Sequence, residues 1–273
     1  MKRFISLLSS RKCLGFIVLV AYYVAVVLPH NEVGSAINAS FASFSRGTYN
    51  AIVAVGFAII SLLAVYYAYK QIPTVVSNRT AIVYLSVMAL LVFLCFTLLM
   101  VINIEAIHFI QYAILAIFLY ALLGNYQDVL VWAVLLGALD EAYQYLILEN
   151  SSFYYDFNDV VLDTVGAAIG LLVLRFTNNR LARNAKRLWY KRPVFYVPIT
   201  LGLVLLILYF TGHFSTNYIS EAPAYFTLFQ RSPPAGFWFY PMGPYARFHI
   251  LTPIPALIII GSIVLIYSRL EKL

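Results

Sequence analysis

Asp140-Glu141-Ala142-Tyr143-Gln144 and Asp156-Phe157-Asn158-Asp159-Val160-Val161-Leu162-Asp163 are two acidic motifs in an otherwise strongly apolar sequence. The first motif lies inside one hydrophobic run, and the second extends into the next run. A charged side chain at the centre of a membrane-spanning helix costs about 2.5–3.5 kcal/mol on insertion scales, so such residues are functional candidates. The stretch from Asp140 to Asp163 therefore predicts apolar helices that carry a polar site.

The composition of the chain is typical of a membrane protein. Of its 273 residues, 63% are hydrophobic and only 11% are charged, and the mean hydropathy is +0.86. A soluble domain has about 25% charged residues, so this chain could not cover its surface in water. The two cysteines, Cys13 and Cys95, lie far apart in apolar segments, and they form neither a disulfide framework nor a metal-binding motif.

The apolar runs predict an all-α, polytopic transmembrane bundle of about eight helices. A helix needs roughly 20 residues to cross a bilayer, and backbone groups in lipid must be paired within the segment, which favours helices over an open sheet. The basic N-terminus and the first run favour a retained signal-anchor over a cleaved signal peptide. The predicted spans are residues 13–30, 50–70, 80–102, 105–123, 128–148, 157–176, 194–212 and 249–268.

The positions of lysine and arginine predict the orientation of these spans. With both termini in the cytoplasm, most of the 18 basic residues fall on the cytoplasmic side, including a cluster at 175–192. The net charge of +7 is therefore interpreted as a topology signal in contact with anionic lipid, and not as a nucleic-acid site. The least certain boundary is Asn103-Ile104-Glu105, because one bent helix there would invert every later span.

Three segments follow from these patterns. Residues 1–178 form the main membrane domain, 179–193 a basic cytoplasmic loop, and 194–273 an additional two-helix hairpin. The outer loop of this hairpin, 213–249, is rich in proline, which excludes a regular helix, and in aromatic residues, which suit the headgroup zone of a membrane. This loop is either an interfacial segment or a lid over the acidic motifs, and His213 and His249 flank it.

Polar residues repeat at helical spacing on three consecutive predicted spans, 105–123, 128–148 and 157–176. Residues three and four apart share one face of a helix, so each span presents a polar stripe. Asp140 lies about 18 Å along its span, in the outer half of the membrane, and the other stripes lie at similar depth. We therefore expect one pocket near the outer leaflet. Its catalytic candidates are His108, Asp140, Glu141, Asp159 and Asp163, and its ligand-binding candidates are Tyr112, Gln144 and Asp156.

The composition of this predicted pocket suits three kinds of chemistry: acid–base catalysis, cation binding through oxygen ligands, and hydrogen bonding to a polar headgroup. Neighbouring carboxylates in a low-dielectric medium cannot all stay ionised, so at least one is expected to be protonated or balanced by a cation. His108 is a candidate counter-charge, proton partner or metal ligand. A purely structural network between helices is the alternative. Small residues at Gly166, Ala167, Ala168 and Gly170 predict close packing of their helix.

These motifs resemble those of the VanZ-like membrane protein family. The resemblance covers roughly residues 10–178 and rests on His108-Phe109-Ile110-Gln111-Tyr112, on Asp140 to Gln144, and on Asp156 to Asp163 leading to Gly166 and Gly170, all within 105–170. The founding member of the family is associated with low-level teicoplanin resistance, so the resemblance implies a cell-envelope protein. Family members often carry arginine after the glutamine motif, where this chain has Glu149-Asn150-Ser151-Ser152, and asparagine at the position of Asp163. Both differences make the site more acidic.

Three functions are compatible with the sequence. The first is an envelope protein whose pocket binds, and in one version modifies, a lipid-linked, glycan or antibiotic-related ligand. The second is a proton- or cation-coupled transporter, although the chain has no inverted repeat. The third is a membrane scaffold held by a polar network. The expected partners are membrane lipids and not nucleic acid, and the expected location is a bacterial cytoplasmic membrane. Whether the protein is an enzyme, and which metal, cofactor or oligomeric state it uses, stay open at this point.

Overall fold

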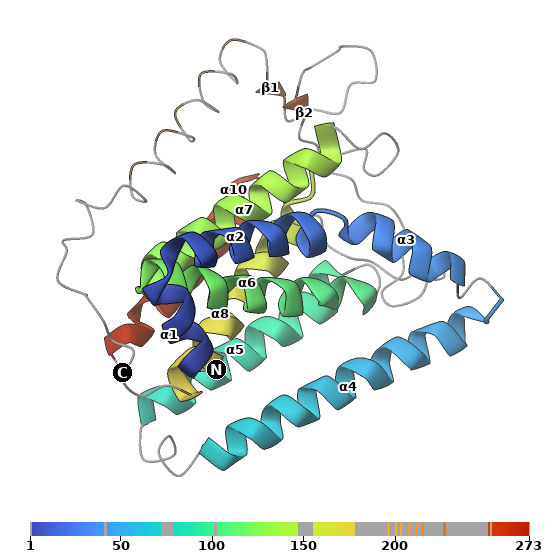
Figure 1. Ribbon diagram of the computed structural model, residues 1–273. Coiled ribbons are helices and arrows are strands. Elements are labelled where there is room, and N and C mark those ends of the chain that lie inside the picture. Colours follow the sequence, from blue (N-terminus) through green and yellow to red (C-terminus); the bar gives the residue numbers. More distant parts are fainter. Residues whose placement is uncertain are drawn as a thin grey trace.

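The computed structural model describes residues 2–40, 43–71, 79–100, 103–146, 155–177, 251 and 253–272, with isolated residues between 196 and 227. These residues are almost entirely helical (Figure 1). The α-helices are α1 (Lys2–Ser10), α2 (Lys12–Tyr22), α3 (His30–Ser40), α4 (Arg46–Gln71), α5 (Arg79–Leu94), α6 (Ile107–Leu123), α7 (Tyr126–Leu146), α8 (Phe157–Thr177) and α10 (Pro253–Tyr267).

Short irregular elements connect or extend several of these helices. Five-residue π-helical turns continue α2 at Tyr23–Val27 and α5 at Cys95–Leu99. Turns of 3₁₀-helix precede α6 at Asn103–Ala106 and follow α10 at Ser268–Lys272. Two-residue strands, β1 (Phe214–Ser215) and β2 (Phe226–Thr227), pair in parallel. The predicted helical class is confirmed for the described residues, with this small strand pair as the exception.

Several helices have the length and composition needed to cross a membrane. Among the described residues these are Ala81–Leu99, Ile104–Leu123 and Phe157–Phe176, with a fourth if the bent pair Arg3–Ser10 and Lys12–Val27 forms one span. They coincide with four of the predicted spans. Helices also occupy the predicted positions of three others, as α4, α7 and α10. Predicted span 194–212, loop 179–193 and most of 213–249 lie outside the described residues.

The break between α5 and α6 falls where the sequence placed its least certain boundary. Met100 has extended backbone angles, φ −72° and ψ 133°, and the 3₁₀ turn at Asn103–Ala106 then starts the next helix. Because two separate helices form here, α5 and α6 run in opposite directions (Figure 1). Gly124 then turns the chain into α7, with a left-handed backbone at φ 72° that glycine adopts without strain.

Helix α8, drawn in yellow in Figure 1, forms the centre of the bundle. It packs most extensively against α6, followed by α7 and α10, and most of its side chains up to Leu174 are buried. Two of its glycines explain how closely it approaches α6. A Cβ atom on Gly166 would lie 2.8 Å from the carbonyl oxygen of His108, and one on Gly170 would overlap the backbone of Ala113. The predicted close packing through small residues is therefore confirmed.

The outer helices expose apolar side chains, while the centre holds polar ones. Leu62 on α4 is 67% exposed and Phe93 on α5 is 61% exposed, whereas Asp140 and Asp163 are fully buried. Soluble monomers rarely expose such large apolar areas, and a lipid environment would cover them. This distribution, together with the span-length helices, is consistent with a membrane location.

Candidate functional site

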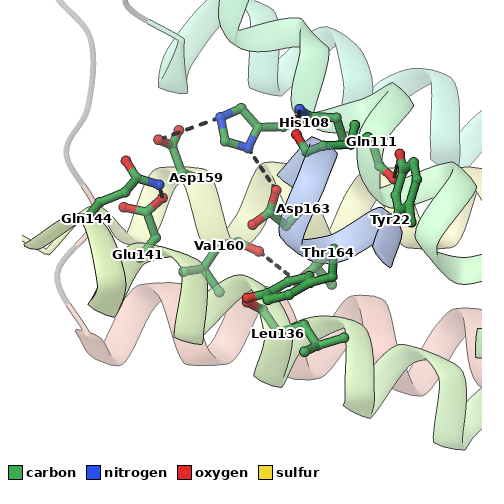
Figure 2. A network of polar contacts seen from close by, with 12 residues as sticks. Tyr22, His108, Gln111, Leu136, Glu141, Gln144, Asp159, Val160, Asp163 and Thr164 are labelled. Atoms are coloured by element: carbon green, nitrogen blue, oxygen red, sulfur yellow. Dashed lines mark hydrogen bonds and ion pairs between the residues drawn. The ribbon is translucent and has the colours of Figure 1, made fainter. Parts of the chain in front are cut away.

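His108 on α6 lies between two carboxylates of α8 (Figure 2). Its Nδ1 atom is 2.8 Å from Oδ1 of Asp163, and its Nε2 atom is 3.8 Å from Oδ2 of Asp159. Asp159 and Asp163 are one helical turn apart, so both face the same histidine. The imidazole is only 3% exposed and Asp163 is fully buried, whereas Asp159 is 19% exposed. The cluster therefore has a closed end at Asp163 and a more open end at Asp159.

The backbone of α8 places Asp163 within reach of His108. Gly166 lies one turn after Asp163, and a Cβ atom there would be 2.9 Å from the Cα atom of Phe109 as well as 2.8 Å from the His108 carbonyl oxygen. Only a glycine allows the two backbones to approach this closely. Without that approach, the short aspartate side chain could not reach the imidazole.

Helix α7 approaches the other side of Asp163. A Cβ atom on Gly137 would lie 2.6 Å from Asp163 Oδ2 and 3.2 Å from its Cβ, so this glycine makes room for the carboxylate. The Tyr112 hydroxyl also faces Asp163, and neither Oδ2 nor this hydroxyl completes a hydrogen bond of normal geometry. Asp163 is thus enclosed by α6, α7 and its own helix, with one oxygen bonded to His108 and the other closely packed.

The two acidic residues of α7 complete the cluster. Gln144 donates from Nε2 to Oε1 of Glu141 at 2.9 Å, and the Glu141 side chain is 1% exposed (Figure 2). Glu141 lies within electrostatic range of Asp159 and Asp163, and Asp140 within range of Asp163 and His108. The structure therefore brings together all five side chains that the sequence proposed as catalytic candidates.

The three residues proposed as ligand-binding candidates have different surroundings. Tyr112 is fully buried beside Asp163, and Gln144 holds Glu141. Asp156 lies just before α8, where its Oδ1 accepts a hydrogen bond from the backbone N–H of Asn158 at 2.8 Å. This contact caps the start of the helix, a usual position for aspartate. Asp156 is also within electrostatic range of Glu141, so it adds to the negative charge of the cluster.

Three further polar residues support the site without having been proposed from the sequence. Asn158 connects three segments: it donates to the Leu99 carbonyl at 3.1 Å and accepts from the backbone N–H of Leu251 at 2.9 Å. The only feature of the sequence that could have pointed to Asn158 is its position inside the second acidic motif. The functional interpretation of that motif considered only its aspartates. The other two are Tyr23 and Tyr155. Tyrosines are frequent in this chain, so the sequence did not distinguish these from packing residues.

The tyrosines fasten the helices around the acidic cluster through backbone carbonyls. Tyr23 donates to Leu136 at 2.7 Å, and Tyr155 donates to Ala138 at 2.9 Å. Both acceptors lie on α7, close to Asp140 in the sequence. Burial, followed by the negative charge of Glu141, raises the pKa of the Tyr155 hydroxyl well above its usual value. This hydroxyl therefore stays protonated and remains a donor.

Four carboxyl groups of the described residues lie near one imidazole in this cluster. Asp159, Asp163 and Asp140 act electrostatically on His108, and Glu141 lies within electrostatic range of the same three acids. The nearest basic residue on α8 is Arg175, about 24 Å along the helix from Asp159. Within the described part of the chain, no group of three or more His, Cys, Asp or Glu side chains is arranged to hold a metal ion.

The chain was compared with known protein families, with curated proteins and with solved structures. None of the three comparisons finds a match. The chemistry open to the site therefore follows from its own atoms. A histidine between a buried and a partly exposed carboxylate can accept, hold and return a proton, and additional acids nearby favour ligands that bring positive charge or donate hydrogen bonds.

Proposed function

We propose that this chain is a VanZ-like protein of the cell envelope whose acidic cluster binds, and modifies by acid–base chemistry, a lipid-linked or glycan ligand. The observation that carries the proposal is the position of His108 between Asp163 and Asp159. The VanZ-like motifs support it because the residues that carry the resemblance are the ones that meet here. The resemblance also supports the association with envelope antibiotics.

The geometry supports different roles for the two aspartates. When His108 donates from Nδ1 to Asp163, its Nε2 atom carries the lone pair and is directed toward Asp159. A substrate hydroxyl about 2.8 Å from Nε2 would donate its hydrogen bond there, beside Asp159 Oδ2, which lies 3.8 Å from Nε2. In this arrangement His108 is the general base, Asp163 fixes its tautomer, and Asp159 lies where a ligand would enter. Glu141 and Asp140 then contact the polar group of the ligand.

We further propose eight spans with both termini in the cytoplasm of a bacterium. Both ends of the chain lie at the same end of the bundle, and α5, α6, α7 and α8 alternate in direction (Figure 1). Arg79 begins α5 and Arg175 lies in the last turn of α8, which places basic residues at the end of the bundle that we assign to the cytoplasm. The acidic cluster lies toward the other end, in the outer half of the membrane.

The test compares cluster variants in a teicoplanin-sensitive bacterium that expresses the chain. We expect the wild type to raise the inhibitory concentration of the antibiotic, and His108→Gln, Asp140→Asn and Glu141→Gln each to abolish the increase. Glu32→Gln is the matched control, because Glu32 is an exposed acid on α3. Equal amounts of each variant in the membrane fraction must be shown. Full resistance in the cluster variants would overturn the proposal.

The concentration of acids in the cluster favours a proton- or cation-coupled transporter as the second candidate. Acids inside a membrane are usual relay groups, and this cluster has several acids for one imidazole. Reconstituted vesicles discriminate the two functions. Flux driven by pH or sodium that Asp140→Asn and Glu141→Gln abolish, in the absence of any change in antibiotic resistance, would favour transport.

A further inference from the structure

Helix α1 turns sharply away from the helix that follows it. The axes of Arg3–Ser10 and Lys12–Val27 meet at 110°, and Arg11 between them has non-helical backbone angles, φ −115° and ψ 73°. The bend is tightly packed, because a Cβ atom on Gly15 would lie 3.0 Å from the carbonyl oxygen of Leu8 and 2.7 Å from Leu122 Cδ2. If α2 crosses the membrane, α1 must therefore lie close to the membrane plane.

The side chains of α1 separate into an apolar and a polar face. Ile5 and Leu8 are 3% and 2% exposed, while Phe4 and Leu7, on the same apolar half, are 42% and 43% exposed. The Phe4 ring contacts the ring of Phe118 on α6 at 5.9 Å between centroids. The apolar half thus packs against the bundle on one side and is left uncovered on the other. The polar half holds Arg3 and serines 6, 9 and 10.

Basic residues gather at this end of the bundle. Arg3, Arg11 and Lys12 are exposed, and no acidic residue occurs in α1 or α2. The C-terminal end of α8 and the 3₁₀ turn Ser268–Lys272 lie at the same end (Figure 1), and they hold Arg175 and Arg269. An exposed apolar strip beside a row of basic residues suits a lipid surface: the strip enters the acyl boundary and the cations meet phosphate groups.

We propose that α1 is an interfacial helix and that Arg3, Arg11 and Lys12 form a binding site for the phosphate of anionic lipids. The occupant is a lipid because the uncovered apolar side chains, Phe4 and Leu7, require acyl chains beside the phosphate. The site lies at the end of the molecule opposite the acidic cluster, and it is independent of the function proposed for that cluster.

The first test is native mass spectrometry of the full chain in detergent with equal amounts of phosphatidylglycerol and phosphatidylcholine. The wild type should retain phosphatidylglycerol preferentially. Arg3→Gln and Arg11→Gln should each reduce the retained ratio about fivefold, the usual effect of one basic residue near an anionic surface. Arg79→Gln is the control, because Arg79 is an exposed arginine outside α1 and α2. An unchanged ratio in the α1 variants, or an equal loss in Arg79→Gln, would overturn the proposal.

The second test places α1 in the membrane by labelling with an impermeant maleimide in inside-out membrane vesicles, where the end assigned to the cytoplasm is exposed to the reagent. Single cysteines are introduced as Ser6→Cys or Leu7→Cys in a chain that carries Cys13→Ala and Cys95→Ala. An interfacial helix predicts labelling of the cysteine at position 6 and protection of the cysteine at position 7. Protection of both positions would show that α1 enters the bilayer as part of a broken span, and labelling of both would show that it is detached from lipid. Either result would overturn the proposal.

Discussion

A single carboxylate, Asp163, connects the three helices of the site. One of its oxygens is 2.8 Å from His108 Nδ1, while the other lies 2.6 Å from the position that a Cβ atom on Gly137 would take. Because the side chain is fully buried, its position is set by the atoms around it and not by solvent. A change on α7 can therefore move a residue of α8 and, through it, the histidine of α6.

Gly137→Ala tests this dependence at the residue scale. The added methyl group would lie 2.6 Å from Asp163 Oδ2, so the carboxylate must shift and its contact with His108 must lengthen. We expect the envelope phenotype to be lost, with a stability cost of about 1–3 kcal/mol from overpacking. Thermal unfolding in detergent and the resistance assay measure the two effects.

Gly56→Ala provides the control for this substitution. Gly56 also lies inside a helix, α4, but a Cβ atom there meets nothing within 4 Å. Alanine favours a helix over glycine by about 1 kcal/mol, so this variant should be as stable as the wild type or more stable, and fully active. Normal resistance in Gly137→Ala would show that the position of Asp163 does not matter for function.

The sequence predicted the members of the cluster but not all of its supports. Acids in apolar runs are conspicuous because their burial is costly, and helical spacing then placed His108, Asp140 and Asp163 on facing stripes. The supports gave no comparable signal. Asn158 and Tyr23 act through backbone carbonyls or N–H groups of distant segments, and such partners are determined by three-dimensional packing.

At the scale of elements, the contact between α6 and α8 holds the site together. Gly166 and Gly170 are four residues apart and both face the backbone of α6, so they act as one contact surface. The sequence predicted this surface from its small residues. It did not predict α3, the bend at Arg11 or the π-helical turn at Tyr23–Val27, because no proline or glycine marks the two irregular positions.

Gly166→Ala should separate the two helices. The new methyl group would lie 2.8 Å from the His108 carbonyl oxygen and 2.9 Å from the Phe109 Cα atom, and both are backbone atoms that cannot rotate away. We expect a loss of about 1–3 kcal/mol in unfolding free energy, measured as a lower melting temperature in detergent. Gly261→Ala on α10 is the matched control, because nothing lies within 4 Å of that position. Equal melting temperatures for the two variants would contradict the close packing.

At the scale of the whole molecule, acidic, basic and apolar side chains occupy different parts of the bundle. Acids collect inside, toward one end, and basic residues such as Arg79 and Arg175 lie at the other end. The periphery of α4 and α5 is apolar. The acidic cluster has two explanations, a structural network that holds the helices together and a functional site that binds a ligand. Substitution of its acids distinguishes them, because it should change the stability of the protein in opposite directions.

Asp140→Asn and Glu141→Gln keep the shape of each side chain and make it permanently neutral. In a functional site the burial of these acids and their mutual repulsion cost stability, so replacing either one should stabilise the protein by about 0.5–2 kcal/mol while function is lost. His108→Gln removes the imidazole that contacts Asp163 and Asp159, and it should destabilise the protein by about 1–3 kcal/mol, because the buried Asp163 loses its hydrogen-bond partner. In a structural network, all three changes should destabilise. The measurement is the change in melting temperature of each variant relative to the wild type, in one detergent at neutral pH. A rise for both acid variants with a fall for His108→Gln supports a functional site. A fall for all three supports a structural network.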